Sequence, residues 1–215
     1  VRIVGTVDRV DTMELGGKPY IRVVDYKTGT KKFDLREVYY GLDCQMLLYL
    51  FTLERNGGHL FSQGTAAGVE YLWADPAPEN IIRPETDDAE PLQAQNYPLE
   101  GLLLDEPSIY HAMDTRGTGA FVPLSFSAKT GEPTAQSAKA RLADREKFNR
   151  IRDHLDGMLT DMAKNLYSGE IDAAPLVPNA SKSPCLWCEY RTVCRHADGE
   201  GERTPLKPDD PFGAE

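Results

Sequence analysis

Residues 7–29, "VDRVDTMELGGKPYIRVVDYKTG", predict a β-hairpin. Two runs rich in β-branched and aromatic residues, at 2–12 and 20–28, have the composition of strands. Between them stand Gly16 and Gly17, a pair favoured in two-residue type I′ turns. The stretch therefore predicts both the two strands and the turn that sets their register.

This register brings charged side chains together. With the two glycines as the turn, Asp8 lies opposite Asp25 at about 5 Å between Cβ atoms. Residues two apart in a strand share a face, so Lys27 projects beside Asp25. Asp11 falls opposite Arg22 on the other face, where the opposite charges attract. The sequence thus predicts two carboxylates and an amine on one face of the hairpin.

Facing carboxylates repel each other unless a cation lies between them. Proteins bind Mg²⁺ through one or two carboxylates, together with water and phosphate oxygens. The bound ion polarises a phosphodiester and lowers the pKa of a bound water, and a neighbouring lysine can hold that water.

The alternative is that Asp8, Asp25 and Lys27 are surface charges, because three-residue matches are common by chance. Apolar residues on both faces of these strands favour a covered sheet, in which unpaired charges are costly.

Hydrophobic spacing and turn residues predict the remaining elements. In chain order these are a helix over 34–56, a strand over 65–74, a variable excursion over 79–135, a long helix over 137–167, a cysteine segment over 181–196 and a disordered tail over 197–215. Gln45 and Tyr49 are four residues apart, so they share a face of the first helix. Taken alone, the pattern indicates that Gln45 is a solvated helix residue and Tyr49 a core residue.

Length and composition indicate a single globular domain that carries an insertion. The chain has 215 residues, of which 40% are hydrophobic and 27% are charged. It has no apolar run of bilayer length and no signal peptide, and Val1 already lies in a predicted strand. We therefore expect a fragment of a longer protein. The net charge of −10 argues against a module that holds nucleic acid by bulk positive charge, but it does not exclude a nuclease that uses metal ions.

Three of the four cysteines, Cys185, Cys188 and Cys194, cluster near the end of the chain. Such clustering favours an iron–sulfur or zinc site over disulfides. Because His196 follows closely, a zinc site of three cysteines and one histidine is also possible. Cys44 falls within the predicted first helix and is expected to be a small buried residue.

The segments "GTVDRVD", "VVDYKTG" and "QMLLYL" resemble the RecB-type nuclease domain of the PD-(D/E)XK superfamily. Four later features follow in the order seen in a narrower family, the C-terminal nuclease domain of the AddB-type subunits of bacterial ATP-dependent helicase/deoxyribonucleases. These features are "LEGLLLDEPSIYHAMD", the long helix, "SGEIDAAPLVP" and "SPCLWCEYRTVC". The resemblance covers residues 1–196.

This resemblance implies an α/β, restriction-endonuclease-like fold, with a central mixed sheet flanked by helices. It also implies a Mg²⁺-dependent deoxyribonuclease of exonuclease type. Asp8 and Asp25 match the metal-binding acids, and the backbone carbonyl of Tyr26 is a further metal contact. Lys27 matches the catalytic lysine. The helical motif that positions DNA and supports the site is matched by Gln45 and Tyr49.

The resemblance further implies a [4Fe–4S] cluster on Cys185, Cys188 and Cys194, with a fourth cysteine far upstream and outside this chain. The expected partners are DNA and the AddA-type helicase–nuclease subunit, in a cytoplasmic complex that processes double-strand breaks for recombination. The alternative is a non-catalytic, nuclease-like scaffold that binds a helicase subunit or DNA and is braced by a metal cluster.

Overall fold

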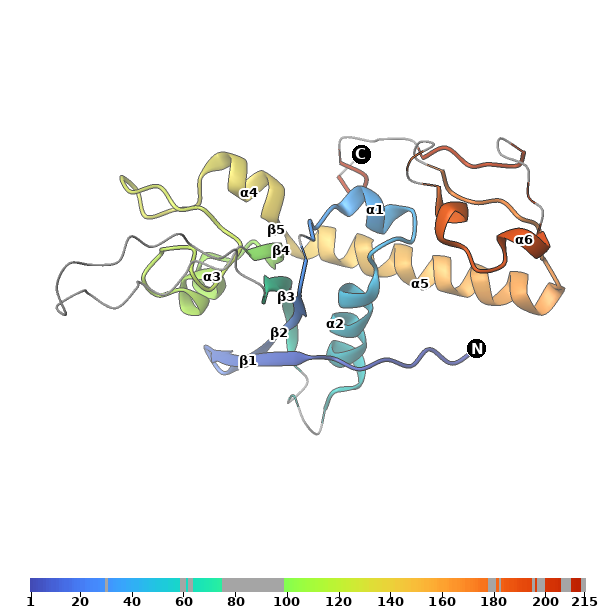
Figure 1. The fold of residues 1–215 in the computed structure, drawn as a ribbon. Helices are drawn as coiled ribbons and strands as arrows, with labels where there is room; N and C mark the ends of the chain where they lie inside the picture. Colours follow the sequence, from blue (N-terminus) through green and yellow to red (C-terminus); the bar gives the residue numbers. More distant parts are fainter. Residues whose placement is uncertain are drawn as a thin grey trace, which may run out of the picture.

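A five-stranded mixed sheet forms the centre of the computed structural model, with the strand order β1-β2-β3-β4-β5 (Figure 1). The structure describes residues 1–29, 31–58, 61, 64–74, 99–177, 181, 183–194, 196, 200–205 and 210–213. The strands are β1 (Arg9–Leu15), β2 (Lys18–Lys27), β3 (Thr65–Trp73), β4 (Leu99–Leu104) and β5 (Leu142–Ala143). Pairing is antiparallel for β1–β2 and β3–β4 and parallel for β2–β3 and β4–β5. This is the α/β architecture that the sequence predicted.

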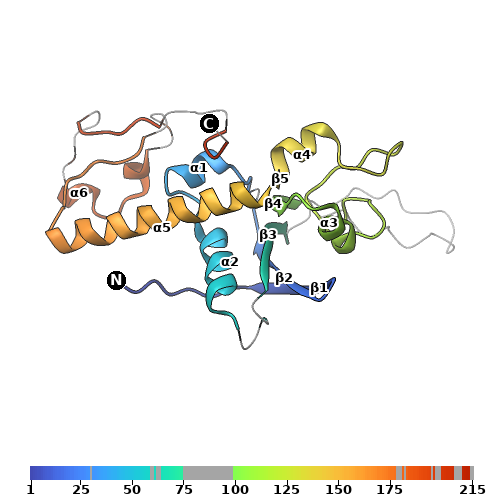
Figure 2. The same cartoon turned by 180° about the vertical axis from the view of Figure 1, so that it is seen from behind.

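Helices flank the sheet on both sides (Figures 1 and 2). The helices of the structure are α1 (Leu35–Tyr39), α2 (Gln45–Asn56), α3 (Pro107–Met113), α4 (Ala135–Arg141), α5 (Arg145–Ser168), the 3-10 helix η2 (Pro184–Trp187) and α6 (Arg191–Cys194), of which η2 and α6 lie beside α5, away from the sheet. The larger apolar core joins α2 and α5 to β2 and β3. A smaller core joins α3 to the loop around Val122 and to Leu142. Among the described residues, no helix combines the length and the apolar character that a bilayer crossing needs.

The predicted hairpin and its register are confirmed. Gly16 and Gly17 have φ angles of 58° and 74°, the left-handed conformation that a type I′ turn requires. The ladder runs from the turn to the pair Arg9↔Val24. Strand β1 begins at Arg9 rather than at residue 2, because its pairing with β2 stops at Arg9↔Val24, three residues before β2 itself ends at Lys27.

The single helix predicted over 34–56 is wrong, because the chain forms α1 and α2 with a break between them. Asp34 caps α1, its side chain accepting a hydrogen bond from the backbone N–H of Arg36. The break contains Gly41 and Asp43, with φ angles of 82° and 54° that no right-handed helix accommodates. A Cβ atom at Gly41 would lie 2.8 Å from Sδ of Met158, so α5 packs closely where the helix breaks.

The long helix predicted over 137–167 is also divided. Leu142 and Ala143 leave helical geometry to pair with β4 as the short parallel strand β5. Asp144 then caps α5, its carboxylate accepting a hydrogen bond from the N–H of Lys147 at 2.6 Å. Gly169 ends α5 in the left-handed conformation.

The segment predicted as a variable excursion over 79–135 contributes to the sheet. Its residues 79–98 lie outside the described residues, but β4 is a buried strand, in which Leu102, Leu103 and Leu104 are at most 1% exposed. Three consecutive leucines are buried on both faces of a strand only when both faces of the sheet are covered. The core at this point is therefore built by residues of the predicted excursion, which was not expected to supply a strand.

The described part of the predicted tail, 197–215, also departs from expectation at Phe212. This residue is 4% exposed and belongs to the larger core. Its ring lies 5.8 Å from the Tyr39 ring, and its carbonyl accepts a hydrogen bond from Nε of Arg150 at 2.8 Å. The buried ring and this hydrogen bond together hold the short stretch against α1 and α5.

Candidate active site

The carboxyl end of β2 carries the aspartate and lysine that the sequence singled out. Asp25 is 7% exposed, and Lys27 lies on the same face two residues later. Oδ2 of Asp25 is buried and forms an ion pair with Nζ of Lys27. Since the Lys27 side chain is 31% exposed, the pair stands where the buried strand meets solvent.

Asp8 lies directly before β1, beside the same end of β2. Its Oδ2 accepts a hydrogen bond from the backbone N–H of Tyr26 at 3.2 Å. The ladder ends at Arg9↔Val24, one position short of the predicted pair of Asp8 and Asp25, so this hydrogen bond rather than strand pairing holds Asp8 at the site. The structure therefore places Asp8, Asp25, Tyr26 and Lys27 at one point of the fold.

The ring of Tyr71 borders this group of residues from the neighbouring strand. Tyr71 is the parallel partner of Asp25, and its ring centroid lies 5.3 Å from Nζ of Lys27. Burial, and next the charges of Asp43 and Asp25, raise the pKa of the Tyr71 hydroxyl, which keeps it neutral. Tyr71 was not among the predicted site residues, because nothing local in the sequence specifies which strand pairs with β2.

A second pair of acids lies in and beside the break between α1 and α2. Asp43 forms an ion pair with Lys31, and its Oδ2 is buried. Burial, and next the hydrogen bond to Asp43, raise the pKa of Glu37. The prediction of a continuous helix concealed this arrangement, because the left-handed turn at Asp43 sets the direction of its side chain.

Gln45 and Tyr49 form a pair on α2, with Nε2 of Gln45 donating to the Tyr49 hydroxyl at 2.9 Å. Both line a pocket of about 870 Å³ together with residues 3–5 and with Leu155 of α5. A Cβ atom at Gly5 would lie 2.4 Å from the Tyr49 hydroxyl oxygen, so a larger residue there would displace the Tyr49 ring. Within the described chain, no hydrogen bond or ion pair links Gln45 or Tyr49 to Asp8, Asp25 or Lys27. Their role in the site stays a prediction.

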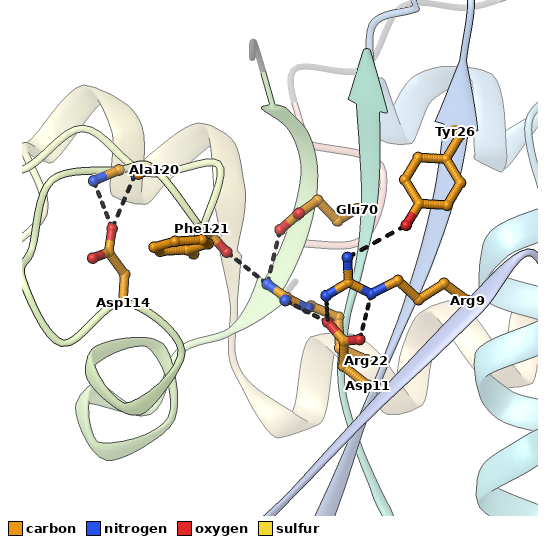
Figure 3. A network of polar contacts seen from close by, with 9 residues as sticks. Arg9, Asp11, Arg22, Tyr26, Glu70, Asp114, Ala120 and Phe121 are labelled. Atoms are coloured by element: carbon orange, nitrogen blue, oxygen red, sulfur yellow. Dashed lines mark hydrogen bonds and ion pairs between the residues drawn. The ribbon is translucent and has the colours of Figure 1, made fainter. Parts of the chain in front are cut away.

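A buried polar network centred on Arg22 lies on the opposite face of β2 (Figure 3). The predicted pair is confirmed, with Nη2 of Arg22 2.6 Å from Oδ2 of Asp11. Nη1 of Arg22 lies 3.0 Å from Oε2 of Glu70 and donates to the carbonyl of Phe121 at 2.6 Å. Burial raises the pKa of Glu70 to about 7, although Arg22 acts in the opposite direction. Glu70 was not predicted to take part, although its charge inside an apolar strand was an available signal.

The same network fixes a loop and extends toward Tyr26 (Figure 3). Asp114 is 1% exposed, and its Oδ2 accepts hydrogen bonds from the backbone N–H groups of Gly119 and Ala120 at 2.7 and 3.1 Å. Arg9 contacts Asp11 and donates to the Tyr26 hydroxyl at 3.4 Å. The network therefore braces β1, β2 and β3 behind the acidic residues.

The donor atoms at the end of β2 fit a magnesium ion. Across the described part of the chain, no three His, Cys, Asp or Glu side chains are arranged to hold a metal. Magnesium does not need three, since it binds one or two carboxylates and takes its other ligands from water and phosphate. Asp8 and Asp25 supply two carboxylates, and the buried Oδ2 of Asp25 is held by its ion pair with Lys27.

The cysteine segment does not form a metal site from its described residues. Cys185 lies in η2, Cys188 follows that helix and Cys194 ends α6, with the last two thiols exposed. These three residues therefore do not fit an iron–sulfur cluster by themselves. Cys44 is buried as predicted, but it precedes α2 rather than lying in mid-helix, and burial raises the pKa of its thiol to about 11.

Comparison with known proteins matches residues 1–195 to a model of the PD-(D/E)XK nuclease superfamily. The chain is 31% identical over 201 residues to the B subunit of the ATP-dependent helicase/deoxyribonuclease of Thermoanaerobacter sp., an alignment that covers 91% of this chain and 17% of that relative. A protein of the same name from Clostridium kluyveri is 33% identical over 200 residues, with the same coverage. The chain thus spans about 17% of the length of these curated relatives.

Proposed function

Because the chain belongs to the PD-(D/E)XK nuclease superfamily, we propose that it hydrolyses phosphodiester bonds of DNA at the end of β2 in a Mg²⁺-dependent reaction of exonuclease type. The observation that carries this proposal is the arrangement of Lys27. Its amine pairs with the buried Asp25, while Asp8 is held against the adjoining peptide. A structural hairpin has no need for this concentration of charge at a buried strand end.

Each residue of the site has a distinct role in this reaction. Asp8 and Asp25, with the backbone carbonyl of Tyr26, would hold the magnesium ion. When bound, the ion supplies charge that polarises the phosphodiester and lowers the pKa of a coordinated water. Lys27 orients the attacking water and offsets the negative charge that develops on the phosphate. Asp25 and the Tyr71 ring hold the lysine amine in place, and Gln45 and Tyr49 position the DNA.

We also propose that this domain acts within a larger helicase–nuclease. The similar proteins are named as B subunits of helicase/deoxyribonucleases, and the chain corresponds to a small part of each. The AddA-type helicase–nuclease subunit would be the partner, in a cytoplasmic complex that processes double-strand breaks for recombination. The full activity would then combine DNA unwinding with cleavage at this site.

The metal site is tested by titrating Mn²⁺ into the protein by calorimetry. The native chain is expected to bind the ion, and Asp8→Asn to weaken binding at least tenfold, because one of two carboxylate ligands is lost. Asp161→Asn, an equal charge change at an exposed position of α5, serves as the control and is expected to bind normally. Binding that does not depend on Asp8 would favour the non-catalytic scaffold instead.

For the intact protein we propose that Cys185, Cys188 and Cys194 join a fourth cysteine outside this chain to hold a [4Fe–4S] cluster. Purified full-length protein is expected to contain iron and acid-labile sulfide in equal amounts, and Cys188→Ser to lose both. Cys44→Ala, which alters the buried thiol, should retain them. Zinc without sulfide would contradict the cluster and indicate the alternative site that includes His196.

A further inference from the structure

A second cleft, of about 570 Å³, lies between the chain segment that follows β2 and the helix α4. Its basic lining residues are Lys32, Arg36, Lys139, Arg141 and Lys147. Its acidic lining residues are Asp34, Glu100 and Asp210. Basic residues therefore outnumber acidic ones in this cleft, hereafter the basic cleft, although the whole chain carries a net charge of −10.

Each acid of the basic cleft is already neutralised by a basic neighbour. Arg36 pairs with Asp34, and Lys147 pairs with Asp210 at 2.8 Å. Nη1 and Nη2 of Arg141 both contact the carboxylate of Glu100. Burial tends to raise the pKa of Glu100, but the hydrogen bonds from Arg141 and from the N–H of Phe33 lower it overall, so the carboxylate stays ionised and paired.

Two lysines remain available to a ligand, one on each wall. Lys32 lies in the segment after β2 and Lys139 lies on α4, and both are exposed. Within the described part of the chain, neither forms a salt bridge. Two amines facing one cleft, next to carboxylates that are already paired, suit an extended polyanion.

The wall of the basic cleft formed by the segment after β2 is fastened to β3 and β4, the two strands that follow β2 in the sheet. The carbonyl of Lys31 accepts a hydrogen bond from Nε1 of Trp73, at the end of β3, at 3.3 Å. The N–H of Phe33 donates to Glu100, on β4, at 3.2 Å. The Phe33 ring lies 6.4 Å from the Tyr71 ring, which in turn borders the amine of Lys27. The rings of Phe33 and Tyr71 therefore form a continuous set of contacts from the basic cleft to the proposed catalytic lysine.

We propose that the basic cleft binds the phosphodiester backbone of the DNA strand whose scissile phosphate lies at Asp8, Asp25 and Lys27. Lys32 and Lys139 contact phosphates that neighbour the scissile one. This inference rests on the proposed nuclease function and adds to it the path that the DNA strand follows. It also explains how an acidic chain holds a polyanion, because the favourable charge is concentrated in one cleft.

The test measures binding of a fluorescent single-stranded oligonucleotide to this chain in EDTA, by anisotropy, over a range of salt concentrations. Lys32→Glu/Lys139→Glu is expected to weaken binding about tenfold or more. The milder Lys32→Gln/Lys139→Gln should reduce the slope of log affinity against log salt by about 1.4, the value for two phosphate contacts on a single strand. The control Lys18→Glu/Lys129→Glu makes the same charge change at exposed lysines that do not line the basic cleft.

The possible outcomes separate the two proposals. The basic cleft would be overturned if the native chain binds and cuts DNA and the glutamine variant keeps native affinity and an unchanged salt slope. The nuclease proposal would then remain intact. Equal weakening in the control variant, or no binding by the native chain, would also overturn the basic cleft. A reduced salt slope that is confined to the cleft variants would support the basic cleft. If, in addition, no protein cuts DNA with Mg²⁺, only the nuclease function would be overturned.

Discussion

Lys27→Ala is expected to lower the rate of DNA cleavage by about 100-fold or more, because it removes the group that orients water and offsets phosphate charge. The fold should persist, since the Lys27 side chain is 31% exposed and lies at the end of β2. The variant leaves Asp25 without its amine partner, which favours binding of a cation there. Single-turnover cleavage of linear DNA in Mg²⁺ measures the effect, and near-ultraviolet circular dichroism checks the fold.

Two comparisons make the Lys27 experiment specific. Lys18→Ala removes an exposed lysine at the opposite end of β2 and is expected to cut at the native rate. Mn²⁺ titration of Lys27→Ala should show native or tighter binding, which separates loss of the catalytic group from loss of the metal. If Lys27→Ala cuts DNA normally, the roles assigned to this site are wrong.

Arg22→Ala is expected to lower the free energy of unfolding by about 3–5 kcal/mol, the cost of leaving buried charges without their partner. Arg22 is 8% exposed and Glu70 is 3% exposed, so little water replaces the lost guanidinium. Asp11 and the carbonyl of Phe121 lose the same donor. Urea unfolding of the native and variant proteins measures the difference.

The Arg22→Ala effect has a pH dependence whose sign follows from Glu70. The folded pKa of Glu70, about 7, already exceeds its ordinary value of 4.5, and loss of Arg22 raises it further. A raised folded pKa gives stability that is present at low pH and lost as the pH rises through that value. The variant should therefore be damaged more at pH 8 than at pH 5.

Control variants separate this effect from a general loss of arginine. Arg116→Ala, in the exposed part of the same loop, is expected to change stability by less than about 0.5 kcal/mol. Arg22→Met/Glu70→Gln, which removes both charges, should cost less than Arg22→Ala. A loss below about 1 kcal/mol for Arg22→Ala at pH 8 would show that the network does not brace the sheet.

The local sequence was sufficient for the hairpin and for the residues that it aligns. Gly16 and Gly17 specify a type I′ turn, and this turn alone sets the register that places Asp11 opposite Arg22 and brings Asp8 toward Asp25. Asp34 likewise marks the start of α1 through its own side chain. These features were predictable because the interacting groups are near in sequence and the turn restricts their geometry.

Only the tertiary structure decided what surrounds that hairpin. Parallel pairing of β2 with β3 brings Tyr71 to Lys27 and Glu70 to Arg22, and the break at Gly41 forms where α5 packs against it. The basic cleft joins residues 32–36 to residues 136–147 in the same way. Contacts between segments so distant in sequence are selected by the packing of the whole core, and no short run of residues carries a signal for them.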